Sequence, residues 1–245
     1  MIELVISNKN EEEIKVINCI KRYFKDWELF EKVWLLVFTI LIIGLSIYWR
    51  DTITGIACSL SGIWCVVLVA KGKISNYWIG IVNIILYAII SYGNKYYGEV
   101  MLNAFYFLPM QFVGAYVWIK NKKPNTKDGI IVKTLTNKNR VIWVIVSILG
   151  VMAYGKVLEL LGGNLPYVDS MSTVLSIMAM LLMVYRFIEQ WILWIIIDIV
   201  TIILWFIAMM KGGNDISILL MWTAYFFNAI YGMYNWIKMY KLQEA

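Results

Sequence analysis

Eight long apolar runs constrain the fold of this chain more than any other feature of its sequence. A helix of about 20 residues is needed to cross a hydrocarbon core about 30 Å thick. The runs do not alternate polar and apolar residues, which excludes a transmembrane β-barrel. Hydrophobic residues make up 61% of the chain and charged residues only 16%. We therefore expect an all-α integral membrane protein with about eight transmembrane helices, at residues 33–49, 52–70, 77–93, 98–119, 141–158, 171–189, 191–210 and 216–237.

Basic residues are distributed unequally between the two sides of the membrane that these spans define. Four of the 22 Lys and Arg fall on one side, and the other 18 fall on the side that carries both termini and the loop 121–140. Because loops rich in Lys and Arg stay in the cytoplasm, both termini and the tail 239–245 are expected to be cytoplasmic. The same asymmetry accounts for the net charge of +6, so the charge does not indicate binding of nucleic acid.

The first 32 residues are polar and include "NEEEIK" instead of the apolar core of a signal peptide, so we expect none. Ile14, Ile17, Ile20, Phe24 and Trp27 recur at roughly helical spacing. This pattern favours a cytoplasmic amphipathic helix in the membrane interface over a simple soluble arm.

Two features of the composition bear on chemistry. Histidine, the commonest metal ligand and general base, is absent. Cys19, Cys58 and Cys65 have no metal-binding spacing, so we expect reduced cysteines that pack in the core, no metal site and no cofactor.

A sequence repeat divides the chain. "GAYVWIK" at 114–120 closes one span and "GMYNWIK" at 232–238 closes another, and upstream Lys71 aligns with Arg186 and Trp78 with Trp194. We expect two parallel three-helix repeats, at 52–120 and 171–238, joined by the basic loop and a linker helix at 141–158, with 33–49 as an extra N-terminal helix. Sugar transporters of the SWEET type have this parallel arrangement, with the substrate site between the repeats near the midplane.

Polar residues inside spans are costly and indicate function by default. Trp191, Trp194 and Asp198 in "EQWILWIIID" share one helix face, where two indoles favour a flat ring and the carboxylate favours a cation. Interface anchoring and a bond to a neighbouring helix are the alternatives.

Amide and aromatic residues provide further candidates. Asn83 and Tyr87 lie one turn apart, and Gln111 and Asn228 precede the two repeated glycines; each could bind a ligand or join helices. Pro109 is expected to kink the span beside Gln111. Weaker candidates, for which packing is the alternative, are Asn103, Tyr106, Trp222 and Tyr225. Arg186 and Glu189 are expected to form a surface ion pair.

Known catalytic signatures are missing from the sequence. It contains no GxSxG, HExxH, Walker-type loop or CxxC, so we expect no enzyme and no catalytic residues.

The stretches "NYWIGIVNIILY", "EQWILWIIID" and "NAIYGMYNWIK" resemble the PnuC family of bacterial vitamin transporters over about residues 52–240. The resemblance implies uptake of nicotinamide riboside across the bacterial inner membrane by facilitated diffusion, with trapping by a cytoplasmic nicotinamide riboside kinase, a SWEET-like fold and a homotrimer. In that case Trp191 and Trp194 would stack on the pyridinium, Asp198 would balance its charge or bind ribose, and Asn83, Gln111 and Asn228 would bind the carboxamide and hydroxyls. Thiamin and riboflavin, which relatives carry, are alternative substrates.

Overall fold

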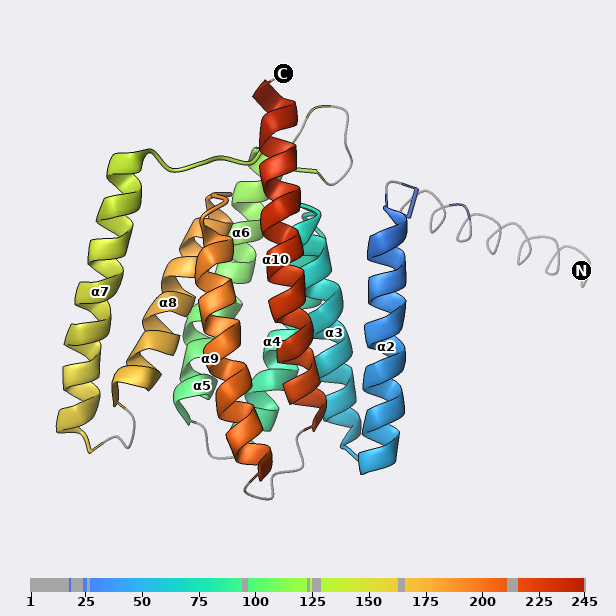
Figure 1. Ribbon diagram of the computed structural model, residues 1–245, viewed down its shortest axis with the longest axis vertical. Coiled ribbons are helices and arrows are strands. Elements are labelled where there is room, and N and C mark those ends of the chain that lie inside the picture. Colours follow the sequence, from blue (N-terminus) through green and yellow to red (C-terminus); the bar gives the residue numbers. More distant parts are fainter. Residues whose placement is uncertain are drawn as a thin grey trace, which may run out of the picture. The chain divides into compact units, whose positions relative to one another are not determined.

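The computed structural model describes residue 18 and residues 24–25, 27–93, 97–122, 124, 129–162, 166–210 and 216–244. Its elements in this part of the chain are all helical (Figure 1). They are α2 (Leu29–Trp49), α3 (Ile53–Ala70), α4 (Asn76–Gly93), α5 (Tyr97–Leu102), the π-helical turn η1 (Asn103–Phe107), α6 (Leu108–Lys120), α7 (Asn137–Leu160), α8 (Pro166–Val184), α9 (Gln190–Met210) and α10 (Ile216–Glu244).

The predicted all-helical membrane fold is confirmed. Seven helical segments of the described chain are long and apolar enough to cross a membrane, with α5, η1 and α6 counted as one. The eighth segment, α10, has 29 residues. At 1.5 Å per residue it also exceeds the thickness of the hydrocarbon core.

The chain forms two compact units, Met1–Val37 and Phe38–Ala245. In the first, Phe24 and Trp27 are in ring contact, and the Glu31 carboxylate accepts a hydrogen bond from the Glu28 amide at the start of α2. This cap explains why the helix begins at Leu29 instead of residue 33. Most of the predicted interfacial helix, and Cys19, lie outside the described residues.

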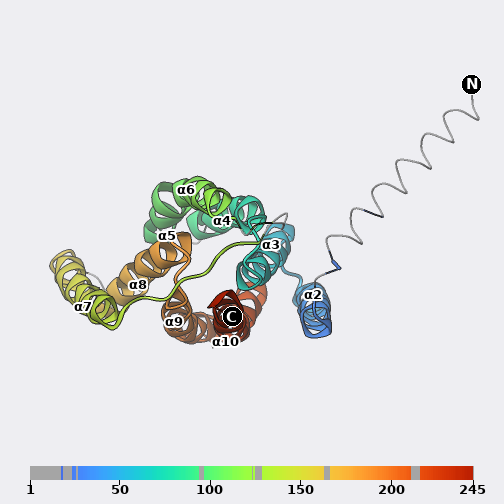
Figure 2. The same ribbon diagram turned by 90° about the horizontal axis from the view of Figure 1, so that it is seen from above.

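Six helices of the second unit form a closed ring. Within each repeat the middle helix packs on the other two, as α4 does on α3 and α6, and α9 on α8 and α10. Between repeats, α3 packs on α10 and α6 packs on α8. Figure 2 shows this ring from above, with α7 outside it against α8. Equivalent helices run in the same direction in Figure 1, as expected of parallel repeats.

Helix boundaries differ from the hydropathy pattern where polar caps decide them. Helix α7 begins at Asn137, not residue 141, because the Thr136 side chain accepts a bond from the Asn139 amide. Helix α8 spans Pro166–Val184 instead of 171–189. It ends there because Arg186 has a positive φ of 65°, which a helix cannot continue through.

The predicted kink at Pro109 takes the form of a π-helical turn. Proline has no amide hydrogen to donate to the carbonyl one turn earlier, and η1 occupies that preceding turn. The wider turn keeps α5 and α6 continuous as one span.

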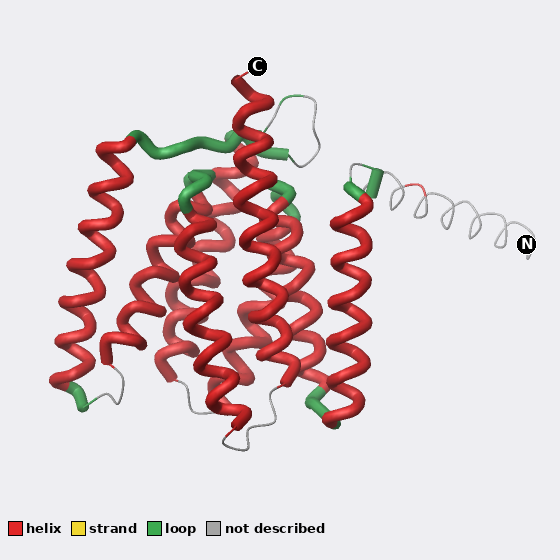
Figure 3. Tube along the Cα trace, in the orientation of Figure 1, coloured by secondary structure: helices red, strands yellow, loops and turns green. Residues whose placement is uncertain are grey.

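Residues 129–136, which we name the strap, belong to the basic loop after α6, yet they pack against the bundle. The strap crosses the end of the bundle at which α6 and α10 terminate, the upper end in Figure 3. Three of its apolar residues are buried: Ile130, Val132 and Leu135. The Lys133 amide and carbonyl bond to Arg186 and Ile188, and Gln243 bonds to both backbone groups of Val132. The run "IIVKTL" at 130–135 interrupts the basic loop with apolar residues, but it does not specify which helices they contact.

The register of the repeat is shifted from the sequence alignment. Gly72, not Lys71, is the equivalent of Arg186, because both have positive φ, of 64° and 65°. Tyr77 then corresponds to Trp191: Tyr77 meets Trp118 edge-on at 5.0 Å, and Trp191 meets Trp236 edge-on at 5.8 Å. Trp78 is not equivalent to Trp194, since it is 55% exposed on the outer face of the ring.

Candidate functional site

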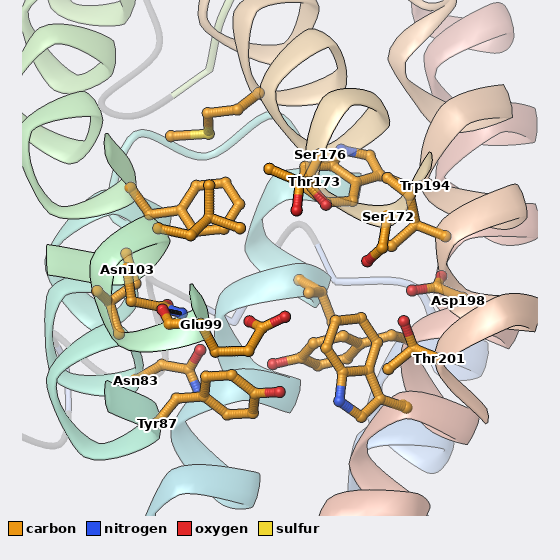
Figure 4. Close-up of a pocket in the computed structure, with 18 of the residues that line it drawn as sticks. Asn83, Tyr87, Glu99, Asn103, Ser172, Thr173, Ser176, Trp194, Asp198 and Thr201 are labelled. Atoms are coloured by element: carbon orange, nitrogen blue, oxygen red, sulfur yellow. Dashed lines mark hydrogen bonds between the residues drawn. The ribbon is translucent and has the colours of Figure 1, made fainter. Parts of the chain in front are cut away.

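A cavity of about 590 Å³ lies inside the ring and is lined by both repeats. Ten of the eleven predicted site residues line it: Asn83, Tyr87, Asn103, Gln111, Trp191, Trp194, Asp198, Trp222, Tyr225 and Asn228. Figure 4 shows the labelled residues facing one another from opposite sides. The eleventh, Tyr106, does not line the cavity, because its hydroxyl donates to the Ile177 carbonyl at 2.8 Å and joins η1 to α8.

Helix α9 presents one polar stripe to the cavity. Trp194, Asp198 and Thr201 recur at intervals of four and three residues, which places them on one face of the helix. Asp198 is 2% exposed, and no hydrogen bond or ion pair among the described residues gives its carboxylate a partner. Among the described residues that line the cavity there is no Lys or Arg. A buried carboxylate without a cation nearby is costly, so a cationic ligand would stabilise it.

Trp191 occupies a different position from Trp194. Trp191 is 3% exposed and packs on Trp236 and over Gly232, where a side chain would collide with the indole. It therefore borders the cavity from within the core at the upper end, whereas the half-buried Trp194 offers more of its surface to the cavity.

The three asparagines of the cavity are anchored through their amide nitrogens. Asn83 donates to the Cys58 carbonyl at 2.8 Å, Asn103 to the Glu99 carbonyl at 2.8 Å, and Asn228 to the Val66 carbonyl at 2.9 Å. These bonds fix the side chains while their oxygens are not engaged in them. The two alternatives left by the sequence, helix joining and ligand binding, are thus compatible.

Gln111 differs from the asparagines because its oxygen Oε1 is buried and has no hydrogen-bond partner. The side chain reaches the cavity over Gly80, where a Cβ atom would stand 2.6 Å from Oε1. A buried acceptor without a donor costs about 1–3 kcal/mol. A ligand N–H would remove this cost.

Aromatic rings form the wall at the α10 side. Trp222 meets Tyr87 edge-on at 6.4 Å and Tyr225 at 5.3 Å. Tyr225 lies over Gly62, which has no side chain to block its hydroxyl.

Several polar residues that line the cavity were not among the site residues predicted from the sequence. They are Glu99 and Asp169, near the starts of α5 and α8, and the hydroxyl residues Ser172, Thr173, Ser176 and Thr201. Ser172 and Ser176 are one turn apart within a span, a pattern that could have indicated a polar helix face. Glu99 lies near a predicted span end, where charges are ordinary.

The two ends of the cavity differ in access. At the lower end it reaches Gly98 and Asp169, which are exposed. At the upper end Tyr77, Trp118, Trp191 and Trp236 form a buried aromatic layer beneath the strap. Cys58 and Cys65 are free thiols, as expected.

The predicted ion pair between Arg186 and Glu189 is wrong. Glu189 pairs with Arg140 at 2.9 Å and accepts from the Leu135 amide, while Arg186 donates to the carbonyls of Ile131 and Val117. Burial lowers the pKa of the Arg186 guanidinium from its ordinary value. Its positive φ turns the side chain from Glu189 toward the strap.

Known proteins are similar to this chain in both sequence and fold. The model of a family described as nicotinamide mononucleotide transporter matches residues 52–238. A protein of Neisseria mucosa named nicotinamide riboside transporter PnuC is 39% identical over 97% of this chain and 92% of its own length. One of the same name from Haemophilus influenzae is 34% identical over 90% of this chain and 95% of its own.

A solved crystal structure of a vitamin B3 transporter PnuC superposes with a TM-score of 0.81 at 39% identity, covering 90% of this chain and 96% of the other. These relatives are multi-pass membrane transporters and not enzymes. The chain belongs to the PnuC family of membrane transporters.

Proposed function

We propose that this protein carries nicotinamide riboside, and that the cavity is its binding site. One observation carries the proposal: the same cavity is lined by Trp194 and the buried Asp198 on one face of α9 and by Gln111, whose Oε1 has no hydrogen-bond partner. Nicotinamide riboside has a flat cationic pyridinium, a carboxamide and a ribose. The indole and carboxylate suit the cation, and Gln111 Oε1 suits the carboxamide N–H groups. The names of the relatives support the same substrate.

The charge of the cavity favours the riboside over its 5′-phosphate. Three carboxylates line the cavity, from Glu99, Asp169 and Asp198, and no described lining residue is cationic. A phosphate monoester carries a charge of about −1.5 to −2 at neutral pH and needs Arg, Lys or helix N-termini to replace its water. The phosphorylated product would therefore be excluded, which is what trapping by a cytoplasmic kinase requires.

Transport would proceed by alternating access. The exposed residues of the described chain that line the cavity are Gly98 and Asp169 at the lower end and Tyr154 in the lower half of α7, so the upper end must open for release. Buried polar atoms without partners occur there in the first turns of α4 and α9: Asn76 Oδ1, Tyr77 Oη, both amide atoms of Gln190, and Trp191 Nε1. Opening would hydrate these atoms and offset part of the cost of breaking the aromatic layer.

The remaining expectations form part of the proposal. Flux would be facilitated diffusion, with both termini and the strap on the cytoplasmic side of a bacterial inner membrane, in agreement with the asymmetry of Lys and Arg. The protein would act as a homotrimer, and a cytoplasmic nicotinamide riboside kinase would phosphorylate the transported substrate.

Calorimetric titration of the purified protein with nicotinamide riboside, its 5′-phosphate, thiamin and riboflavin tests the substrate. We expect binding of the riboside and at least about 100-fold weaker binding of the phosphate, since an unpaired buried charge costs several kcal/mol. Preferred binding of thiamin or riboflavin would assign another vitamin. Equal binding of the phosphate would contradict the charge argument.

Uptake into vesicles that contain neither ATP nor kinase tests the mode of transport. Labelled riboside should equilibrate to equal concentrations inside and outside. Accumulation above the external concentration would show coupling to an ion gradient and would overturn facilitated diffusion.

A further inference from the structure

We infer that Glu99 accepts hydrogen bonds from the ribose hydroxyls of the substrate and is a specificity-determining residue for the sugar. The inference rests on the proposed function, because it assumes a cationic ribonucleoside in this cavity. It assigns the cationic pyridinium to α9 of one repeat and the sugar to α5 of the other.

Glu99 is placed to contact a ligand. It lies in the first turn of α5, is half-buried, and lines the cavity between the exposed Gly98 and the buried Asn103. Figure 4 shows its carboxylate pointing into the cavity from the side opposite Asp198. The Asn103 amide donates to the Glu99 backbone carbonyl at 2.8 Å and so fixes the start of this span.

The Glu99 carboxylate lacks donors among the described residues. None of their hydrogen bonds or ion pairs involves its oxygens, and no Lys or Arg of the described chain lines the cavity. An ionised carboxylate only accepts hydrogen bonds, through two oxygens. Removed from water without donors it would be costly, so a ligand that brings two adjacent O–H groups matches it.

The charge of the pyridinium is already matched on the other side of the cavity. Trp194 and Asp198 lie one helical turn apart on α9, so a ring that stacks on the indole lies close to that carboxylate. The Gln111 acceptor, which suits the carboxamide, is buried deeper than Glu99. A ring bound there directs its ribose toward the lower end, where Glu99 stands. The cis-diol of ribose can then donate both protons to one carboxylate, as acidic residues accept from ribose in dinucleotide-binding folds.

Three probes separate the sugar from the charge. Nicotinamide riboside has both, N1-methylnicotinamide keeps the cation and carboxamide without the ribose, and dihydronicotinamide riboside keeps the ribose without the cation. Affinities of all three are measured by calorimetry, or by competition against labelled riboside, for the full-length wild type and the variants Glu99→Gln and Asp198→Asn.

We expect Glu99→Gln to lower the affinity for the riboside and for dihydronicotinamide riboside by about tenfold each, which is the effect of roughly one charge-assisted hydrogen bond. Its affinity for N1-methylnicotinamide should stay within about twofold of wild type. Asp198→Asn should lower the affinity for the two cationic probes and leave the affinity for dihydronicotinamide riboside within about twofold of wild type. Equal losses for the riboside and N1-methylnicotinamide in Glu99→Gln would overturn the inference, because Glu99 would then act through charge alone. Unchanged affinity for the riboside would overturn it as well.

Controls keep misfolding and failure of the proposed function apart from failure of the inference. Each variant is compared with wild type by thermal melting and size exclusion. Glu159→Gln removes a carboxylate of α7 that is paired with Lys156 and does not line the cavity, so it should bind like wild type. If wild type itself does not bind the riboside, the proposed function fails; if wild type binds and Glu99→Gln shows no selective loss, the inference alone fails.

Discussion

The two repeats are alike at their upper ends and different where they line the cavity. At the upper end the Trp118 indole donates to the Met183 carbonyl of the other repeat at 3.1 Å, and Trp236 donates to the Val69 carbonyl at 2.9 Å. Each accepting carbonyl lies three residues before the positive-φ residue of its repeat. In the cavity, Trp194 and Asp198 of the second repeat have no counterpart in the first, which contributes Glu99 and the amides Asn83, Asn103 and Gln111, whereas the second contributes one amide, Asn228.

This difference shows which parts of a duplicated helix unit can diverge. The upper ends must make the same turn and cross the same partner helix, so packing and backbone bonding retain the pattern. Nicotinamide riboside, the proposed substrate, has no two-fold symmetry, so a site between two repeats can bind it selectively only if the repeats carry different side chains. Gly80 and Trp194 show the result: they are equivalent in the register set by Gly72 and Arg186, and both line the cavity.

Replacing the glycines at the upper end should have the largest effect. Gly114 contacts the Tyr77 ring and Gly232 contacts the Trp191 ring, so a valine at either position must displace a buried aromatic residue. We expect each variant to lose about 3 kcal/mol of stability, measured as a lower melting temperature in detergent. Gly44→Ala is the control, because nothing lies within 4 Å of its added methyl group. A tolerated valine at only one glycine would break the equivalence of the repeats.

Trp194→Ala should have the next largest effect, on binding and not on folding. Loss of a stacking face beneath the cation should lower the affinity for nicotinamide riboside by about 30-fold, or about 2 kcal/mol, as measured by calorimetric titration. Trp78→Ala removes an exposed indole that the sequence alignment pairs with Trp194. Its affinity for nicotinamide riboside should stay within about twofold of wild type. Similar losses for the two would contradict the register in which Gly72 matches Arg186.

Trp118→Phe and Trp236→Phe should have smaller and similar effects. Each leaves a buried carbonyl without its indole donor, at a cost of about 1–2 kcal/mol in thermal or denaturant unfolding. The double variant should deviate from additivity, because the two indoles are in contact at 5.9 Å. A strong effect of one and none of the other would show that the repeats are held together from one side only.

Patterns local in sequence predicted much of this molecule. Apolar length identified the spans, and polar residues inside apolar helices identified ten residues that share one cavity, because burying such residues in lipid is costly. The same logic failed for Tyr106, whose hydroxyl joins two helices, and it passed over Glu99, which lies near a span end where a carboxylate is ordinary on hydropathy alone.

The order of residues is enough to establish that the chain crosses a membrane as helices and that a three-helix unit occurs twice, since hydropathy and repeated helix endings are properties of contiguous residues. The tertiary structure alone decided that 129–136 forms a buried strap, that Glu189 pairs with Arg140, and that Gly72 corresponds to Arg186. These features depend on contacts between residues more than 40 positions apart and on backbone angles that no residue pattern specifies. Arginine can hold a positive φ at this turn because the strap supplies partners for its side chain and its carbonyl.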